Sequence, residues 1–231
     1  MKSACVPTLS RAGGPQAVIR ILAAALTFGT ASACWTATPV AVDFAPPTRA
    51  YHGAEYPDVY NRWTRHTKVV HDVDTALEVW ATYKSDEFRE AFVARYAEAY
   101  GLKEGVLDPL RQAQRDAADA SYEFVVTAQS SNYKWNDLEK KSSPWRVMLR
   151  DAAGHEVAPN DLKVEKLPDQ VERAFYPVKT PFSKTYLVRF TRALARDEGF
   201  VGERSGLIAL RFAGPFGHAD LVWQARSAER D

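Results

Sequence analysis

The chain has 231 residues, of which 46% are hydrophobic and 12% aromatic, enough apolar side chain to build a folded core. Its 30 Lys and Arg nearly balance its 29 Asp and Glu, for a formal net charge of +1. This balance argues against a nucleic-acid partner, which needs a concentrated basic patch, and against membrane binding through charge alone.

Residues 1–33 have the three parts of a secretory signal. Basic residues make the segment positive, and no Asp or Glu occurs before position 43. A short apolar core follows at positions 21–26, and the small residues at 31 and 33 suit a signal peptidase. A bilayer-spanning helix takes roughly 20 apolar residues. The segment therefore predicts a signal peptide that is removed on export, and not a membrane helix.

Cys34 would become the first residue of the mature chain. The other cysteine, Cys5, would leave with the signal peptide, so Cys34 would have no disulfide partner in an oxidising compartment. The segment Ala31-Ser32-Ala33-Cys34 resembles the lipobox of bacterial lipoproteins. The resemblance implies a diacylglyceryl group on Cys34 and attachment to a membrane of the cell envelope, the outer membrane of a Gram-negative bacterium being the expected one.

A second interpretation of the cleavage site stays open. Lipoboxes usually carry Leu at the position of Ala31. Cleavage after Ala33 by the ordinary signal peptidase would instead yield a soluble periplasmic or secreted protein.

Residues 34–54 show no hydrophobic period and contain three prolines, Pro39, Pro46 and Pro47. Such a composition is extended and does not bury a core. We therefore expect a flexible, lipid-anchored tether over residues 34–54, followed by one folded domain over residues 55–231.

The domain begins with two predicted strands and two predicted helices. Alternation predicts an edge strand at 63–70 and, after a turn, a strand at 75–84. A helix is expected near 86–100, with Ser85 as its N-cap and Gly101 at its end. Its rings recur every fourth residue, which predicts packing on the sheet: Phe88, Phe92, Tyr96 and Tyr100.

A second helix is expected near 109–119. Asp108 would be its N-cap, and Pro109 would stand at its first position, where the missing N–H costs nothing. With the first helix it would form a helical hairpin inserted after the second strand.

After residue 120 the hydrophobic period returns to two. The predicted strands cover residues 122–128, 145–149, 162–167, 185–192, 206–213 and 219–225. Strands at this spacing, separated by Pro, Gly and Asn, are typical of an antiparallel β-sandwich. The predicted fold class is thus α+β, a sandwich-like domain with an inserted helical hairpin.

Two segments of the domain loosely resemble uncharacterised envelope lipoproteins of Gram-negative bacteria. They are Trp80-Ala-Thr-Tyr-Lys-Ser85 and Ser143-Pro-Trp-Arg-Val-Met-Leu149. The resemblance covers the mature chain, but it implies no activity and no site residue.

The sequence contains no familiar catalytic motif. It has no Gly-x-Ser-x-Gly elbow, no His-Glu-x-x-His and no phosphate-binding glycine loop, and its histidines form no coordinating cluster. We therefore expect a non-catalytic protein without metal or cofactor. Two alternatives stay open: an envelope hydrolase that pairs Asp72, Asp137 or Glu139 with a histidine, and a carrier of an apolar ligand beside Phe88 and Tyr96.

Aromatic residues in polar loops are the candidate binding residues: Tyr133, Trp135, Phe182 and Phe200. Loop rings supply rigid contact area at many binding surfaces. On an extended loop Tyr133 and Trp135 would project to the same side. The expected partner is an envelope protein or a glycan. The alternative is that each ring holds its own loop on the core.

Overall fold

The computed structural model describes residues 40–166, 173–177 and 180–226. All of them belong to one compact unit that begins at Thr38. Cys34 and the predicted signal peptide lie outside the described residues. No helix within the described ranges has the length and apolarity that crossing a bilayer requires.

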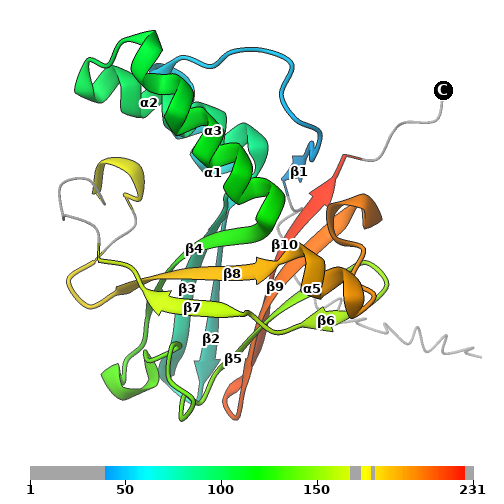
Figure 1. Cartoon of the computed structure of the whole chain (residues 1–231). Coiled ribbons are helices and arrows are strands. Elements are labelled where there is room, and N and C mark those ends of the chain that lie inside the picture. Colours follow the sequence, from blue (N-terminus) through cyan, green and yellow to red (C-terminus); the bar gives the residue numbers. More distant parts are fainter. Residues whose placement is uncertain (1–39, 167–172, 178–179, 227–231) are drawn as a thin grey trace, which may run out of the picture. The chain divides into compact units, whose positions relative to one another are not determined.

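Ten strands form two five-stranded sheets (Figure 1). The first sheet has the order β1 (Ala41–Val42), β10 (Gly217–Ala225), β9 (Leu207–Gly214), β5 (Arg146–Asp151) and β6 (Glu156–Val157). The second has the order β2 (Thr64–His71), β3 (Asp74–Tyr83), β4 (Ser121–Gln129), β8 (Lys184–Thr191) and β7 (Asp161–Val164). All neighbours are antiparallel except β1 and β10. The predicted α+β class is confirmed at this level.

The helices α1 (Tyr56–Trp63), α2 (Asp86–Tyr100) and α3 (Glu104–Ala120) lie together at one end of the described unit (Figure 1). A short helix, α5 (Arg192–Asp197), follows β8. The described residues also form the single 3-10 turns η1 (Gly53–Glu55), η2 (Tyr133–Trp135) and η3 (Gly202–Ser205).

Helix α2 has the predicted bounds and the predicted caps. Ser85 Oγ accepts a hydrogen bond from the backbone N–H of Phe88 at 3.1 Å, and Gly101 ends the helix with φ of 62°. The predicted packing of its rings on the sheet is wrong. Phe88 lies 5.7 Å from the ring of Tyr56 on α1, and Phe92 lies 4.8 Å from the ring of Phe175. Helix α1, absent from the prediction, covers the face that was assigned to the sheet.

Helix α3 begins five residues before the predicted start. Lys103 is its N-cap, and Pro109 lies inside the helix. Proline leaves the carbonyl four residues earlier, that of Gly105, without its helical hydrogen bond, and the proline ring crowds that carbonyl. Gly105 is exposed, so water can satisfy its carbonyl. Pro109 is therefore a local cost in a helix that nevertheless continues through it.

The predicted tether is too long, because its described part is attached to the fold. Ala41–Val42 pairs with the end of β10, and Val42 is buried. Further along, Tyr51 Oη donates a hydrogen bond to Glu87 Oε1 at 2.7 Å. Backbone pairing and burial hold this proline-rich stretch in place. Its sequence has no hydrophobic alternation that would predict a strand. Residues 34–39 lie outside the described residues.

Candidate functional site

The turns at one end of the two sheets meet, and we call them the loop end: residues 69–75, 130–136, 180–183 and 214–217. Ser131 N donates to the carbonyl of Thr75 at 3.0 Å, which joins the β4–β5 loop to the β2–β3 turn. The ring of Phe216, in the β9–β10 turn, lies 5.3 Å from His71. In Figure 1 the β9–β10 turn and the end of β2 lie at the bottom of the view.

The loop on which Phe182 lies is tied to the same end of β4. Thr180 Oγ1 donates to Gln129 Oε1 at 2.8 Å, and Gln129 Nε2 donates to Glu78 Oε2 at 2.7 Å. Four large apolar side chains of the loop end are exposed to solvent, at 60%, 97%, 78% and 83%: Val70, Val73, Tyr133 and Phe182. The loop end therefore exposes large apolar side chains on three separate connections, among exposed charged residues that include Asp72, Asp74 and Lys134.

The four predicted binding residues differ in their exposure to solvent. Tyr133 and Phe182 are exposed, as a contact role requires. Trp135 is partly buried, with its ring 4.2 Å from that of Phe216. Phe200 is buried, with its ring 5.4 Å from that of Tyr122. Trp135 and Phe200 therefore hold their own loops.

The predicted common direction of Tyr133 and Trp135 is also wrong, because the segment is the 3-10 turn η2 and not an extended loop. Each residue of a 3-10 helix turns by about 120°, so side chains two residues apart diverge by about 120° around the axis. The side chain of Asn132 accepts from Lys134 N at 3.1 Å and starts this turn. Asn at a turn start is a sequence signal for such a cap, and it could have indicated η2.

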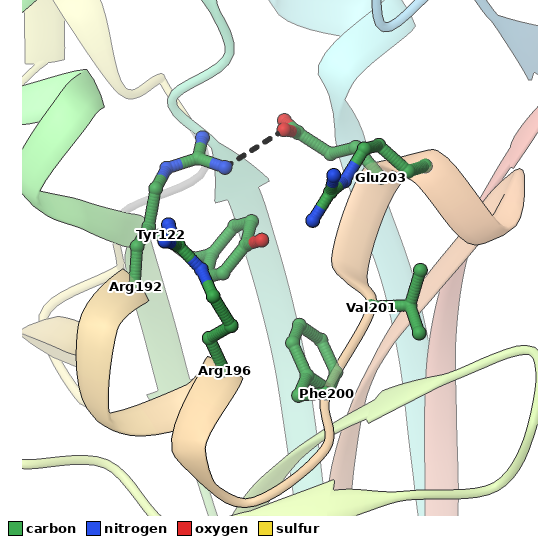
Figure 2. Close-up of a pocket in the computed structure, with 7 residues that line it drawn as sticks. Tyr122, Arg192, Arg196, Phe200, Val201 and Glu203 are labelled. Carbon is green, nitrogen blue, oxygen red and sulfur yellow. Dashed lines mark hydrogen bonds and ion pairs between the residues drawn. The ribbon is translucent and has the colours of Figure 1, made fainter.

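A second candidate region is a pocket of about 430 Å³ between α5 and η3, which we call the arginine pocket (Figure 2). Arg192 is held there by four contacts, one of which is a hydrogen bond that its Nη2 donates to Tyr83 Oη at 3.4 Å. Its Nε donates to the carbonyl of Ala118 at 2.7 Å, and its Nη1 pairs with Glu203 Oε2 at 3.0 Å. Its guanidinium lies 3.9 Å from the centre of the Tyr122 ring. Burial opposes the positive charge, but the nearby Tyr83 and Glu203 outweigh it and raise the pKa of Arg192.

Tyr122 and Phe200 line the pocket with Arg192 (Figure 2). Burial raises the pKa of the Tyr122 hydroxyl, and the positive charges of Arg192 and Arg204 oppose that rise. Gly202 has φ of 67°, and a Cβ atom there would lie 2.1 Å from Tyr122 Oη. Only glycine therefore allows η3 to approach the tyrosine this closely.

The carboxylates considered for a hydrolase do not form a catalytic pair with histidine. Asp137 pairs with Lys140 at 3.6 Å, and Asp72 is exposed beside His71. In the described part of the chain, no hydrogen bond or ion pair joins a histidine to Asp137 or Glu139, and no three potential ligands gather to hold a metal ion.

Two buried carboxylates of the described residues do pair with a histidine: Glu78, whose Oε1 lies 2.9 Å from His66 Nε2, and Asp151. Asp151 Oδ2 lies 3.1 Å from His155 Nδ1 and also accepts from the backbone N–H of Val201 at 3.0 Å. Burial raises the pKa of Asp151, but these hydrogen bonds outweigh burial and hold that pKa below its ordinary value. Because Asp151 joins β5 to the loop of Phe200, the pair fastens that loop beside the arginine pocket.

The carrier alternative placed a ligand beside Phe88. This ring is fully buried and in contact with the rings of Tyr56 and Tyr176, at 5.7 and 6.5 Å. Phe88 therefore belongs to the packed core.

No family model matches the sequence, and no curated protein matches it. A crystal structure of a protein of unknown function from Burkholderia pseudomallei K96243 aligns with 77% of this chain and 93% of its own length. The two are 14% identical, with a TM-score of 0.36. This degree of similarity assigns no function to the chain.

Proposed function

We propose that the chain is a non-catalytic lipoprotein of the cell envelope, a binding module whose loop end contacts an envelope protein. In this proposal residues 1–33 are its export signal, and a lipid on Cys34 is its membrane anchor. The proposed body is a β-sandwich with an inserted helical hairpin. Contacts between the sheets support the sandwich, because Phe124 of β4 and Tyr83 of β3 lie 5.3 and 6.2 Å from Trp223 of β10.

The observation that carries the proposal is the exposure of four large apolar side chains at the loop end, namely Val70, Val73, Tyr133 and Phe182. Exposed apolar groups gathered in one region are typical of contact sites. Two of the four are valines, whose branched side chains pack well on apolar protein surface. Sugar rings instead stack on flat aromatic platforms, so the mixture favours a protein over a glycan.

The entry point of the chain supports the same assignment. Val42 pairs with Ala225 at the last residue of β10, whereas the loop end lies at the Gly217 end of that strand. The nine residues of β10 separate the two ends by about 30 Å. Cys34 precedes Val42 by eight residues, which extend to about 28 Å at most. A lipid at Cys34 would therefore leave the loop end free for a partner.

The anchor is tested by metabolic labelling with a fatty-acid analogue. We expect the wild-type chain to be labelled and to fractionate with membranes, and Cys34→Ala to be unlabelled and soluble. Equal absence of label and equal solubility of the two proteins would mean that the protein is secreted without a lipid.

The contact surface is tested by placing a photo-crosslinking residue at Tyr133 or at Phe182 in the full chain, expressed in its envelope. Both positions should give the same discrete product, and a protease should remove its added mass. Tyr100, exposed on α2, is the matched control position and should not give that product. A product that resists protease but is shortened by a glycan-degrading enzyme would show that the partner is a glycan and not a protein. Identical products from all three positions, or none, would contradict the proposal.

A further inference from the structure

The arginine pocket holds more positive than negative charge. Its one lining carboxylate, Glu203, is already engaged, because it accepts a hydrogen bond from Tyr83 Oη and pairs with Arg192 at 3.0 Å. Arg196 and Arg204 also line the pocket, and both are exposed. Within the described ranges neither of these two has an ion pair or a side-chain hydrogen bond. Two guanidinium groups therefore remain available in the same concavity as Arg192.

The walls of the pocket are held in place without a ligand. Arg192 is fixed by Ala118, Glu203 and the Tyr122 ring, as described above, and Asp151 fastens the loop between Phe200 and Val201. Figure 2 shows Arg192 and Arg196 on α5 opposite Glu203 on η3, with the Tyr122 ring between them. A ligand would therefore order only the side chains of Arg196 and Arg204, and binding to a preorganised site loses little conformational entropy.

The pocket lies at the end of the sheet where the chain enters the fold. The carbonyl of Gly206, two residues after Arg204, accepts from Ala225 N at 2.8 Å. The next residue, Arg226, donates from its backbone N–H to the carbonyl of Val42 at 3.1 Å. The arginine pocket and the entry strand β1 are thus neighbours at the end of β10, opposite the loop end.

We propose that the arginine pocket binds a phosphate group, presented by an anionic lipid headgroup or by a small soluble phosphate ester. The guanidinium fork donates paired hydrogen bonds to phosphate oxygens. The two unpaired forks of Arg196 and Arg204, with the positive charge of Arg192 beside them, suit a group with several acceptor oxygens. The volume of about 430 Å³ accommodates a headgroup-sized ligand. The location beside the entry strand favours the lipid source, since an anchored chain would hold this end near headgroups.

The test uses the full mature chain carrying Cys34→Ala, so that no covalent lipid contributes to binding. Its affinity is measured for three probes. They are phosphatidylcholine vesicles containing phosphatidic acid, vesicles of phosphatidylcholine alone, and soluble glycerol 3-phosphate. The test variant is the double substitution Arg196→Gln and Arg204→Gln. The matched control is Lys134→Gln with Arg146→Gln, which removes the same charge from exposed residues in or beside the loop end.

We expect the test variant to lose about tenfold or more in affinity for the phosphate probe, as removal of charge-assisted hydrogen bonds does. The control variant should change by less than about twofold. Loss confined to phosphatidic acid vesicles identifies the lipid as the source, and a parallel loss with glycerol 3-phosphate identifies a soluble ester. Equal losses in both variants, or no binding by the unsubstituted arginine pocket, would overturn the proposal. None of these outcomes bears on the loop end.

Discussion

Replacing Glu123 with Gln should lower the free energy of unfolding by about 3–5 kcal/mol, as breaking a buried ion pair does. Glu123 is 2% exposed on β4. Its Oε1 lies 2.5 Å from Lys84 Nζ, and its Oε2 lies 3.5 Å from Arg89 Nη2. Arg89 is also buried, and removal of the carboxylate would leave both cations desolvated without a counter-charge. The free energy is measured by urea unfolding at neutral pH.

The difference in unfolding free energy between the wild-type protein and Glu123→Gln should depend on pH in one direction. Burial raises the pKa of Glu123, but Lys84 and Arg89 outweigh burial and hold that pKa below its ordinary value. A carboxyl whose folded-state pKa is depressed stabilises the fold above its unfolded pKa, and this stability is lost as the pH falls through the folded value. The wild-type protein and Glu123→Gln should therefore converge in stability as the pH falls below about 4.

The matched control is Glu156→Gln. Glu156 pairs with Arg211 at 2.9 Å, but its side chain is about one-third exposed, at 34%. Such a pair contributes about 1 kcal/mol or less. If both variants lose the same small amount of stability, the cluster around Glu123 is hydrated and the expectation of a buried ion pair is wrong.

Replacing Phe88 with Ala should destabilise the protein by about 3–5 kcal/mol, the range for truncation of a buried Phe. Phe88 is fully buried and lies among the rings of Tyr56, Phe92 and Tyr176. The cavity left by its ring would be lined by large side chains that cannot all move inward. The loss is measured as the change in unfolding free energy with denaturant.

Tyr100→Ala is the control, because Tyr100 belongs to the same four-residue repeat on α2 but is exposed. Its removal should cost less than about 1 kcal/mol, the level of surface sites. A similar cost for both substitutions would mean that the stripe is buried along its whole length. A negligible cost for Phe88→Ala would remove it from the core.

Much of the secondary structure could be predicted from local pattern. Ser85 and Gly101 mark the two ends of α2, and the structure places both caps at those residues. The two-residue period predicted β3, β4, β8, β9 and β10 to within a few residues, because alternation follows directly from the geometry of a strand. Helix α1 had a signal as well. Tyr56, Val59, Tyr60 and Trp63 recur at helical spacing and are all buried.

Contacts that join distant parts of the chain left little local trace. Val42 lies in a proline-rich stretch, and its strand exists because β10, about 180 residues later, offers an unpaired edge. Tyr133 and Trp135 have similar surroundings in sequence, yet only Trp135 meets the ring of Phe216 and becomes partly buried. Which loop ring is exposed therefore depends on which turn lies beside it.

The sequence by itself determined the class of fold, the strand and helix positions that repeat locally, and the expectation of export with a lipid on Cys34. The tertiary structure decided the surfaces that can bind. Strand pairing brings Tyr122, Arg192 and Arg204 around one pocket, although they come from β4, α5 and η3. It also buries Glu123 between cations from α2, β8 and the connection between β3 and α2. The charge and exposure of the arginine pocket and of the Glu123 cluster depend on contacts between distant residues. The spacing of residues along the chain does not predict such contacts.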